Sequence, residues 1–239
     1  MEALADVGPL VVLDVPGQPG LSSGLRPRRN RMDAYATWLA EALAEVTREP
    51  AVVVGHSLGA AITLACPSDL VAVRVLVSPG GLVRLRVGAS VLAATVPWLL
   101  RPSYVRARRL LGCMTAPGHA VPDELSTWMS LVGRSCHSSL APSPLPDAVL
   151  ARAAATTPCL TLVGSEDVFL PPKLLGPVVE RRLGSRARVL SGSGHLLPEE
   201  APEQVAALVA EFLRSVRRCH GGESAPSAPE KQQNGTVDR

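Results

Sequence analysis

The chain has 239 residues, of which 46% are hydrophobic and 19% are charged. This length fits one large α/β domain, and the apolar content excludes an intrinsically disordered chain. The formal net charge is only +3, which excludes the strongly basic surface of a typical nucleic-acid-binding protein. Aromatic residues make up 3% of the chain, so its core has to be built mainly from Ala, Val and Leu.

The sequence shows no pattern typical of a disulfide framework, a secretion signal or a membrane span. Five cysteines are scattered along the chain without the paired spacing of a disulfide framework or a zinc site. The N-terminus has two acidic residues and no basic segment, unlike a secretion signal. The longest apolar run, residues 87–100, contains Pro97 and is too short to span a bilayer. We therefore expect reduced thiols and a cytoplasmic location, with no membrane span.

Apolar runs of two kinds alternate in the first third of the chain. Residues 8–14 form a β-branched run that predicts a strand, and Asp14 is expected to fix the turn that starts at Pro16. Residues 32–46 repeat apolar side chains at helical spacing. Residues 51–55 and 71–77 predict two buried strands, separated by an apolar helix at residues 58–66. Strands without polar alternation predict an α/β fold with a parallel sheet covered on both faces.

The pattern changes after residue 78. Residues 79–155 form irregular helical stretches interrupted by prolines, which indicates a helical lid inserted into the domain. The alternation resumes with predicted strands at residues 159–164 and 187–191 and helices at residues 172–183 and 198–217. Residues 219–239 are polar and are expected to be a disordered tail. We therefore predict one domain over residues 1–218.

A G-x-S-x-G motif at residues 55–59 lies between a predicted strand and a predicted helix. In this context it predicts a nucleophile elbow, a sharp turn that exposes the Ser57 hydroxyl. We expect Gly55 and Gly59 to be required, because a Cβ at either position would collide where strand and helix pack closely. The Leu58 backbone N–H, at the helix N-terminus, would stabilise an oxyanion. An ordinary turn with an incidental serine is the alternative.

A serine nucleophile needs a base and a group that orients the base. The strand at residues 159–164 is followed by Asp167, and the strand at residues 187–191 is followed by His195. Because the carboxyl ends of parallel strands share one edge of the sheet, Ser57, Asp167 and His195 can converge there. Glu166 is the alternative acid.

The motifs that carry a family resemblance lie in order along the chain: Asp14-Val15-Pro16-Gly17, Gly55-His56-Ser57-Leu58-Gly59, Gly164-Ser165-Glu166-Asp167, and Gly194-His195 followed by Pro198-Glu199-Glu200-Ala201-Pro202-Glu203. With them, residues 8–216 resemble the α/β-hydrolase superfamily. The resemblance implies a three-layer α/β-hydrolase fold with a mostly parallel sheet and a lid. It also implies Ser57 as nucleophile, His195 as general base and acid, and Asp167 as the residue that holds the imidazole tautomer.

Similar proteins carry about three strands, and a His-Gly loop with a second oxyanion N–H, before the position of residue 8. This sequence starts almost on the strand at residues 8–14, so the resemblance implies an N-terminally truncated fold. A reading frame started too late, a segment supplied by a partner chain and a decayed, inactive homologue are three explanations. The absent strand would lie between residues 8–14 and residues 51–55, and its loss would leave backbone groups unpaired.

Other notable residues have simpler interpretations. His56, next to Ser57, is expected to pack or form a hydrogen bond rather than act as the base. The arginines at positions 26, 28, 29 and 31, and those at 101, 106, 108 and 109, are expected to form solvated basic faces. Apolar residues of the insertion, among them Val91, Trp98 and Trp128, would either roof an apolar pocket or complete the core.

The sequence therefore predicts a cytoplasmic serine hydrolase that cleaves a small, fairly apolar ester or related acyl compound through an acyl-enzyme. No metal or organic cofactor is implied, and the expected partner is a small-molecule acyl substrate rather than a nucleic acid. A non-catalytic hydrolase-like binding scaffold is one alternative. Acyl transfer, lactone opening or carbon–carbon bond hydrolysis by the same three residues is another, because fold and triad do not determine the substrate.

Overall fold

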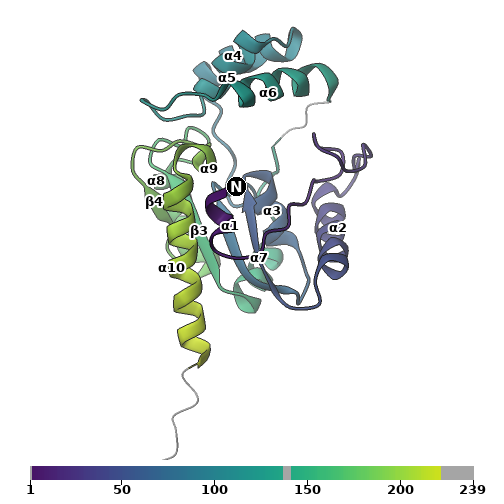
Figure 1. The fold of residues 1–239 in the computed structure, drawn as a ribbon, viewed down its shortest axis with the longest axis vertical. Coiled ribbons are helices and arrows are strands. Elements are labelled where there is room, and N and C mark those ends of the chain that lie inside the picture. Colours follow the sequence, from purple (N-terminus) through teal and green to yellow (C-terminus); the bar gives the residue numbers. More distant parts are fainter. Residues whose placement is uncertain (1, 137–140, 222–239) are drawn as a thin grey trace, which may run out of the picture.

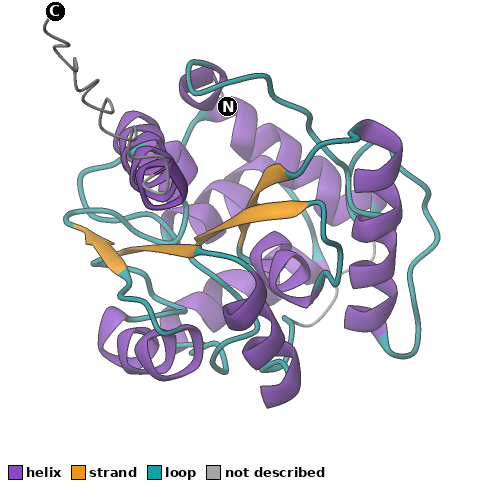
Figure 2. Ribbon diagram, turned by 90° about the horizontal axis from the view of Figure 1, so that it is seen from below, coloured by secondary structure: helices purple, strands orange, loops and turns teal. Residues whose placement is uncertain are grey.

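The computed structural model describes residues 2–136 and 141–221. Within them, four parallel strands form one sheet in the order β1-β2-β3-β4. The strands are β1 (Ala51–His56), β2 (Val71–Val77), β3 (Cys159–Gly164) and β4 (Arg188–Leu190). The central strands β2 and β3 follow apolar runs of the sequence because helices pack on both of their faces (Figure 2). The predicted α/β class and parallel sheet are thus confirmed.

Helices occupy most of the remaining described chain (Figure 1). They are α1 (Glu2–Ala5), α2 (Arg31–Val46), α3 (Leu58–Ala65), α4 (Ala89–Leu100), α5 (Tyr104–Gly112), α6 (Asp123–Ser135), α7 (Asp147–Thr156), α8 (Pro172–Leu183), α9 (Leu197–Glu200) and α10 (Pro202–Gly221). The helices predicted at residues 32–46, 58–66 and 172–183 are confirmed as α2, α3 and α8.

The helix predicted at residues 198–217 differs from the structure at both ends. It is divided at Ala201 into α9 and α10, because Pro202 lacks an N–H for a continuing helix and instead starts the next one. α10 then continues to Gly221. Residues 219–221 therefore belong to a helix and not to the predicted tail, and residues 222–239 lie outside the described residues.

Two apolar layers hold the helices on the sheet. On one face, residues of α2, α3, α7 and α8 form a buried cluster that includes Leu64 and Leu175. On the other face, α9 and α10 pack on β2 and β3 through residues such as Leu197 and Val205. The strands are held between these layers, so their carboxyl ends meet at one rigid edge.

Arg74 is a buried charged residue that the sequence analysis missed. It lies on β2 with 1% of its surface exposed. Its guanidinium donates hydrogen bonds to the carbonyl oxygens of Thr63 and Cys66, each at 3.1 Å, and to Thr156 Oγ1 at 3.3 Å. These groups belong to the C-terminal ends of α3 and α7, where carbonyls lack partners within the helix and a cation is favoured. Arg74 therefore joins both helices to the centre of the sheet.

The strand predicted at residues 8–14 is wrong. These residues are extended but unpaired, and Val11 and Val12 are 62% and 64% exposed. A strand needs a hydrogen-bonded neighbour, and β1 pairs with β2 on one side only within the described sheet. Leu13 and Val15 instead pack beside α2 and α3.

The turn after this segment follows the prediction for Asp14. The Asp14 carboxylate accepts a hydrogen bond from the Leu21 backbone N–H at 2.8 Å. A Cβ added at Gly20 would lie 2.6 Å from Asp14 Cγ. The turn is therefore closed around this carboxylate.

The predicted insertion contains two different parts. α4, α5 and α6 form a cap that is separated from the sheet in Figure 1 and has its own small core. α7 instead packs with α3 and α8, and its Leu150 and Ala153 belong to the main core. Residues 137–140, between α6 and α7, lie outside the described part.

Candidate active site

Ser57 lies in a strained turn between β1 and α3. Its φ of 50° and ψ of −107° are unusual for a residue with a Cβ, so the surrounding structure has to maintain them. The Ser57 N–H donates to the Val77 carbonyl at 2.9 Å, and the Gly80 N–H donates to the Ser57 carbonyl at 3.0 Å. The sharp strand–turn–helix geometry expected of a nucleophile elbow is therefore present.

The two glycines of the motif have different environments. A Cβ on Gly55 would lie 2.5 Å from the Gly59 backbone, so no side chain fits there. A Cβ on Gly59 would meet nothing within 4 Å. The expectation of a steric requirement is thus confirmed for Gly55 and wrong for Gly59, because the close approach is between the Gly55 Cα and the backbone of α3.

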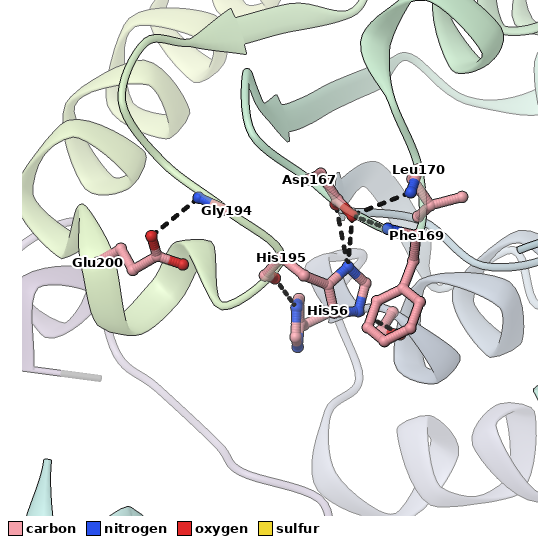
Figure 3. Close-up of polar contacts among 8 residues, drawn as sticks. His56, Asp167, Phe169, Leu170, Gly194, His195 and Glu200 are labelled. Atoms are coloured by element: carbon pink, nitrogen blue, oxygen red, sulfur yellow. Dashed lines mark hydrogen bonds and ion pairs between the residues drawn. The ribbon is translucent and has the colours of Figure 1, made fainter. Parts of the chain in front are cut away.

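His195 lies between Ser57 and Asp167, although the three residues come from separate parts of the chain. Its Nε2 is 3.1 Å from Ser57 Oγ. On the other side of the ring, its Nδ1 is 2.9 Å from Asp167 Oδ2, a contact drawn in Figure 3. Asp167 follows β3 and His195 follows β4, so the sheet edge brings them together as the strand order predicts. Glu166, the alternative acid, accepts from the Ser165 hydroxyl instead.

The Asp167 carboxylate is buried, and hydrogen bonds from neighbouring groups stabilise its charged form. Burial alone would raise the pKa of this carboxyl, but the hydrogen bond from His195 and the backbone N–H of Leu170 bring its pKa below the ordinary value. Oδ1 accepts from the N–H groups of Phe169 and Leu170 at 3.0 and 2.9 Å. Asp167 is therefore prepared to accept the Nδ1–H proton in a hydrogen bond without becoming protonated.

The ring and backbone of His195 are held from several directions. The Phe169 ring meets the imidazole edge to face, with centroids 4.9 Å apart. The His195 N–H donates to the Met114 carbonyl at 2.8 Å, and His56 Nε2 donates to the His195 carbonyl at 2.8 Å. The cap and the nucleophile turn thus both contact the histidine loop.

His56 has the hydrogen-bonding role expected from the sequence. Burial, followed by the nearby charge of His195, lowers its pKa to about 4. His56 is consequently neutral near pH 7, with its Nε2 proton directed at the His195 carbonyl. Its position beside the imidazole, with ring centroids 5.2 Å apart, does not make it a second base for Ser57.

Glu200 is a residue of this site that the sequence analysis did not single out. Its Oε2 accepts hydrogen bonds from the backbone N–H groups of Gly194 and Ala116, each at 2.8 Å (Figure 3 draws the first). One carboxylate thereby joins the residue before His195 to the segment after α5. Its place between Pro198 and Pro202, five residues after the histidine, was the available sequence signal.

Leu58 is the first residue of α3, directly after Ser57. The N–H groups of the first helical turn have no carbonyl partner inside the helix, and they carry the positive end of the helix dipole. An oxygen that develops negative charge beside Ser57 would meet this end of α3.

Among the described residues, no group of three or more His, Cys, Asp or Glu side chains could hold a metal ion. Within the same residues, no helix is both long and apolar enough to cross a membrane. The arrangement of Ser57, His195 and Asp167 is therefore the clearest centre of reactive groups described. It can move a proton from a hydroxyl to an imidazole whose opposite nitrogen faces a carboxylate.

Comparisons with known proteins identify related sequences. A family model described as "Alpha/beta hydrolase family" matches residues 1–208. Lipase LipV of Mycobacterium tuberculosis is 30% identical over 205 residues, which cover 76% of this chain and 76% of the lipase.

Solved structures with the same fold include two enzymes of different named activity. Carboxylesterase CesB of Bacillus subtilis has a TM-score of 0.65 and 18% identity, covering 85% of this chain and 72% of CesB. A meta-cleavage product hydrolase of Pseudomonas fluorescens has a TM-score of 0.61 and 23% identity, covering 80% of this chain and 75% of its own. At these identities the likeness concerns the fold.

Proposed function

Because this chain belongs to the alpha/beta hydrolase family, we propose that it is a serine hydrolase that cleaves a small, fairly apolar ester or related acyl compound. The observation that carries this proposal is the continuous hydrogen-bonded series from Ser57 Oγ through the His195 ring to Asp167. A nucleophile, a base and a group that orients the base are the three parts that transfer of an acyl group to a neutral serine requires.

The proposed reaction starts with attack of Ser57 Oγ on the substrate carbonyl carbon. His195 Nε2 takes the hydroxyl proton as the new C–O bond forms, and the Asp167 carboxylate stabilises the resulting imidazolium. Collapse of the tetrahedral intermediate expels the alkoxide, which takes the proton back from His195 and leaves as an alcohol. Water, deprotonated by the same nitrogen, then attacks the acyl-enzyme and releases a carboxylic acid and free Ser57.

The negative oxygen of the intermediate is assigned to the N-terminus of α3. The Leu58 N–H would donate one hydrogen bond to it, aided by the helix dipole. The loss of one such donor in comparable sites lowers the rate by about 10²–10³-fold, so this contact is a substantial part of the proposal.

The substrate class has support from the relatives and from the chain itself. Lipase LipV, the relative described above, and carboxylesterase CesB carry names that denote ester hydrolysis. Met114, whose carbonyl accepts from the His195 N–H, packs against the apolar core of the cap. We therefore propose an apolar acyl ester as the substrate rather than a charged or strongly polar compound.

Covalent labelling with a fluorophosphonate tests the proposal most directly. The wild-type chain is expected to react at one site, and mass spectrometry should locate the adduct on the peptide that contains Ser57. Ser57→Ala should abolish labelling, whereas Ser191→Ala, at an exposed serine after β4, should not change it. A wild-type protein that unfolds cooperatively but remains unlabelled would overturn the proposal.

A second measurement addresses the acyl group. Rates with p-nitrophenyl esters of graded chain length should rise from acetate toward a medium-length acyl chain if the site is apolar, and Ser57→Ala should remove all rates above the buffer background. Equal turnover by wild type and Ser57→Ala would contradict the assigned nucleophile.

A further inference from the structure

The exposed side of α4 after its first turn consists of apolar side chains. Its outward residues are Leu92, Ala93, Val96, Leu99 and Leu100. Leu92 is 52% exposed and Leu100 is 76% exposed. The twelve-residue helix contains no charged side chain at all. A helix on a water-facing surface normally presents polar residues there, so this face indicates contact with something other than water.

The opposite side of α4 already supplies what the cap fold requires. Ala94 and Trp98 are buried in a cluster with Ala107 and Leu110 of α5. Trp98 Nε1 also donates to the Met129 carbonyl of α6 at 3.2 Å. α4 is thereby fixed on its inner side, and the outer leucines do not contribute to this core. In Figure 1, α4 and α5 lie beyond α6 when viewed from the sheet, at one end of the molecule.

The sequence next to this face is rich in arginine. No Asp or Glu occurs between Asp69 and Asp123, a segment that holds seven arginines. Four of them lie directly after α4 or within α5, at positions 101, 106, 108 and 109. Arg108 is paired with Asp123 at 2.6 Å. Arg101 directly follows the apolar helix, and Arg109 is on the exposed side of α5, four residues after the 73%-exposed Val105.

We propose that the outer face of α4, together with the arginines of α5, docks on the surface of an anionic lipid bilayer. The leucines and valines enter the boundary between headgroups and acyl chains, and the guanidinium groups contact lipid phosphates. An apolar surface flanked by basic side chains is the combination that binds such membranes, because burial and charge attraction act together.

Charge distinguishes this occupant from a second copy of the chain. Two copies joined through the α4 face would bring the same excess of arginine together, and like charges in apposition oppose association. An anionic bilayer presents the opposite charge and a large apolar interior. The docking surface is separate from Ser57, so it goes beyond the proposed hydrolase function and does not depend on it.

Vesicle co-sedimentation tests the docking surface. The full chain is incubated with vesicles of pure phosphatidylcholine or of phosphatidylcholine with phosphatidylglycerol, at low and at high salt. We expect binding to the anionic vesicles that weakens with salt and with removal of phosphatidylglycerol. Ser57→Ala should bind as well as wild type, which separates this result from any failure of the hydrolase proposal.

Two double variants divide the apolar from the charged contribution. Leu92→Ser with Leu100→Ser is expected to lower the partition coefficient at least about tenfold, through lost insertion. Arg101→Gln with Arg109→Gln is expected to lower it about tenfold or more on anionic vesicles only. All four side chains are exposed, so the fold should persist, and cooperative thermal unfolding checks this.

Two control variants carry the same kinds of substitution on other surfaces of the molecule. Leu21→Ser with Leu174→Ser removes two other exposed leucines, and Arg181→Gln with Arg217→Gln makes the same charge change on α8 and α10. Neither should change vesicle binding. No binding of the wild type to anionic vesicles, or an equal effect of the control variants, would overturn the proposal. A dimer in sedimentation velocity that Leu92→Ser with Leu100→Ser dissolves would instead assign the face to a second copy.

Discussion

The two flanks of the candidate active site differ in burial and in hydrogen bonding. On the β3–β4 flank, Asp167 and His195 are buried, and each is held by several hydrogen bonds to backbone or side-chain groups. On the β1 flank, the sheet has an open edge in the described structure, with Val52 and Val54 each 38% exposed. Ser57 lies where these flanks meet.

The orientation of the three side chains and the covering of the sheet edge are therefore separate features of the site. His195 and Asp167 are oriented by contacts after β3 and β4 and by the His56 side chain at the end of β1. None of these contacts needs a strand on the open edge of β1. Ser57 likewise obtains its strained φ from bonds to Val77 and Gly80 on the β2 side. The proton-transfer geometry can therefore form although residues 8–14 are unpaired. The following predictions test this division, starting with the largest effect.

Asp167→Asn removes the charge that orients His195. We expect kcat to fall about 10⁴-fold, as for other triads whose aspartate is replaced by asparagine, because the wrong tautomer then faces Ser57. The measurement is steady-state hydrolysis of the best p-nitrophenyl ester. Glu166→Gln should have little effect, since that side chain contacts only Ser165. A large loss with Glu166→Gln would move the acid to the neighbouring position.

His56 should make stability depend on pH. Its pKa is about 4 in the folded chain and 6.5 ordinarily, so the unfolded state binds more protons between these values. The free energy of unfolding should fall as pH decreases from about 6.5 to 4. The contribution of His56 to this fall is on the order of 2–3 kcal/mol. Urea unfolding at pH 7.0 and 4.5 measures the change. His56→Gln keeps an N–H donor but does not titrate, so its stability should fall less between these two pH values. An identical fall in wild type and variant would contradict the assignment of this pH dependence to His56.

Gly55→Ala and Gly59→Ala distinguish the two glycines of the elbow. The Gly55 variant places a Cβ against backbone atoms, and we expect a destabilisation of about 1–3 kcal/mol. The Gly59 variant places its Cβ in open space at the start of α3, where alanine should stabilise the helix by about 0.5–1 kcal/mol. Urea unfolding measures both. Equal destabilisation by the two variants would mean that the elbow is packed more tightly than described.

Glu200→Ala should loosen the well-ordered flank without removing a reacting group. It leaves the N–H groups of Gly194 and Ala116 without their acceptor, which we expect to cost about 1–2 kcal/mol of stability. A shift of His195 should lower kcat about tenfold or more with a smaller change in KM. Glu200→Gln retains one acceptor oxygen and should restore most activity. The exposed Glu199→Ala serves as the control, and an equal effect there would refute the positioning role.

Val12→Ser examines the open flank, where the smallest effect is expected. Because Val12 is 64% exposed in an unpaired segment, its change should alter the free energy of unfolding by less than about 0.5 kcal/mol. Leu162→Ala, at a fully buried position of β3, should cost about 2–5 kcal/mol in the same assay. A loss above 1 kcal/mol for Val12→Ser would show that residues 8–14 are packed in solution.

The sequence by itself determined the parts that depend on local pattern. Mainly apolar runs predicted β1, β2 and β3, because a strand that packs against helices needs apolar side chains at most of its positions. The G-x-S-x-G motif specified the elbow, and the position of Asp167 and His195 after their strands specified the shared edge.

Only the tertiary structure decided the features that depend on neighbours from distant parts of the chain. Residues 8–14 have the composition of a strand but no partner to pair with, so they remain extended and exposed. Arg74 and Glu200 look like ordinary charged residues until helix carbonyls and loop N–H groups surround them. From the sequence, the apolar residues of α4 could either roof a pocket or complete the core, and only packing shows which leucines point outward. Local pattern fixes what a segment can form, whereas burial and hydrogen-bond partners decide what it does form.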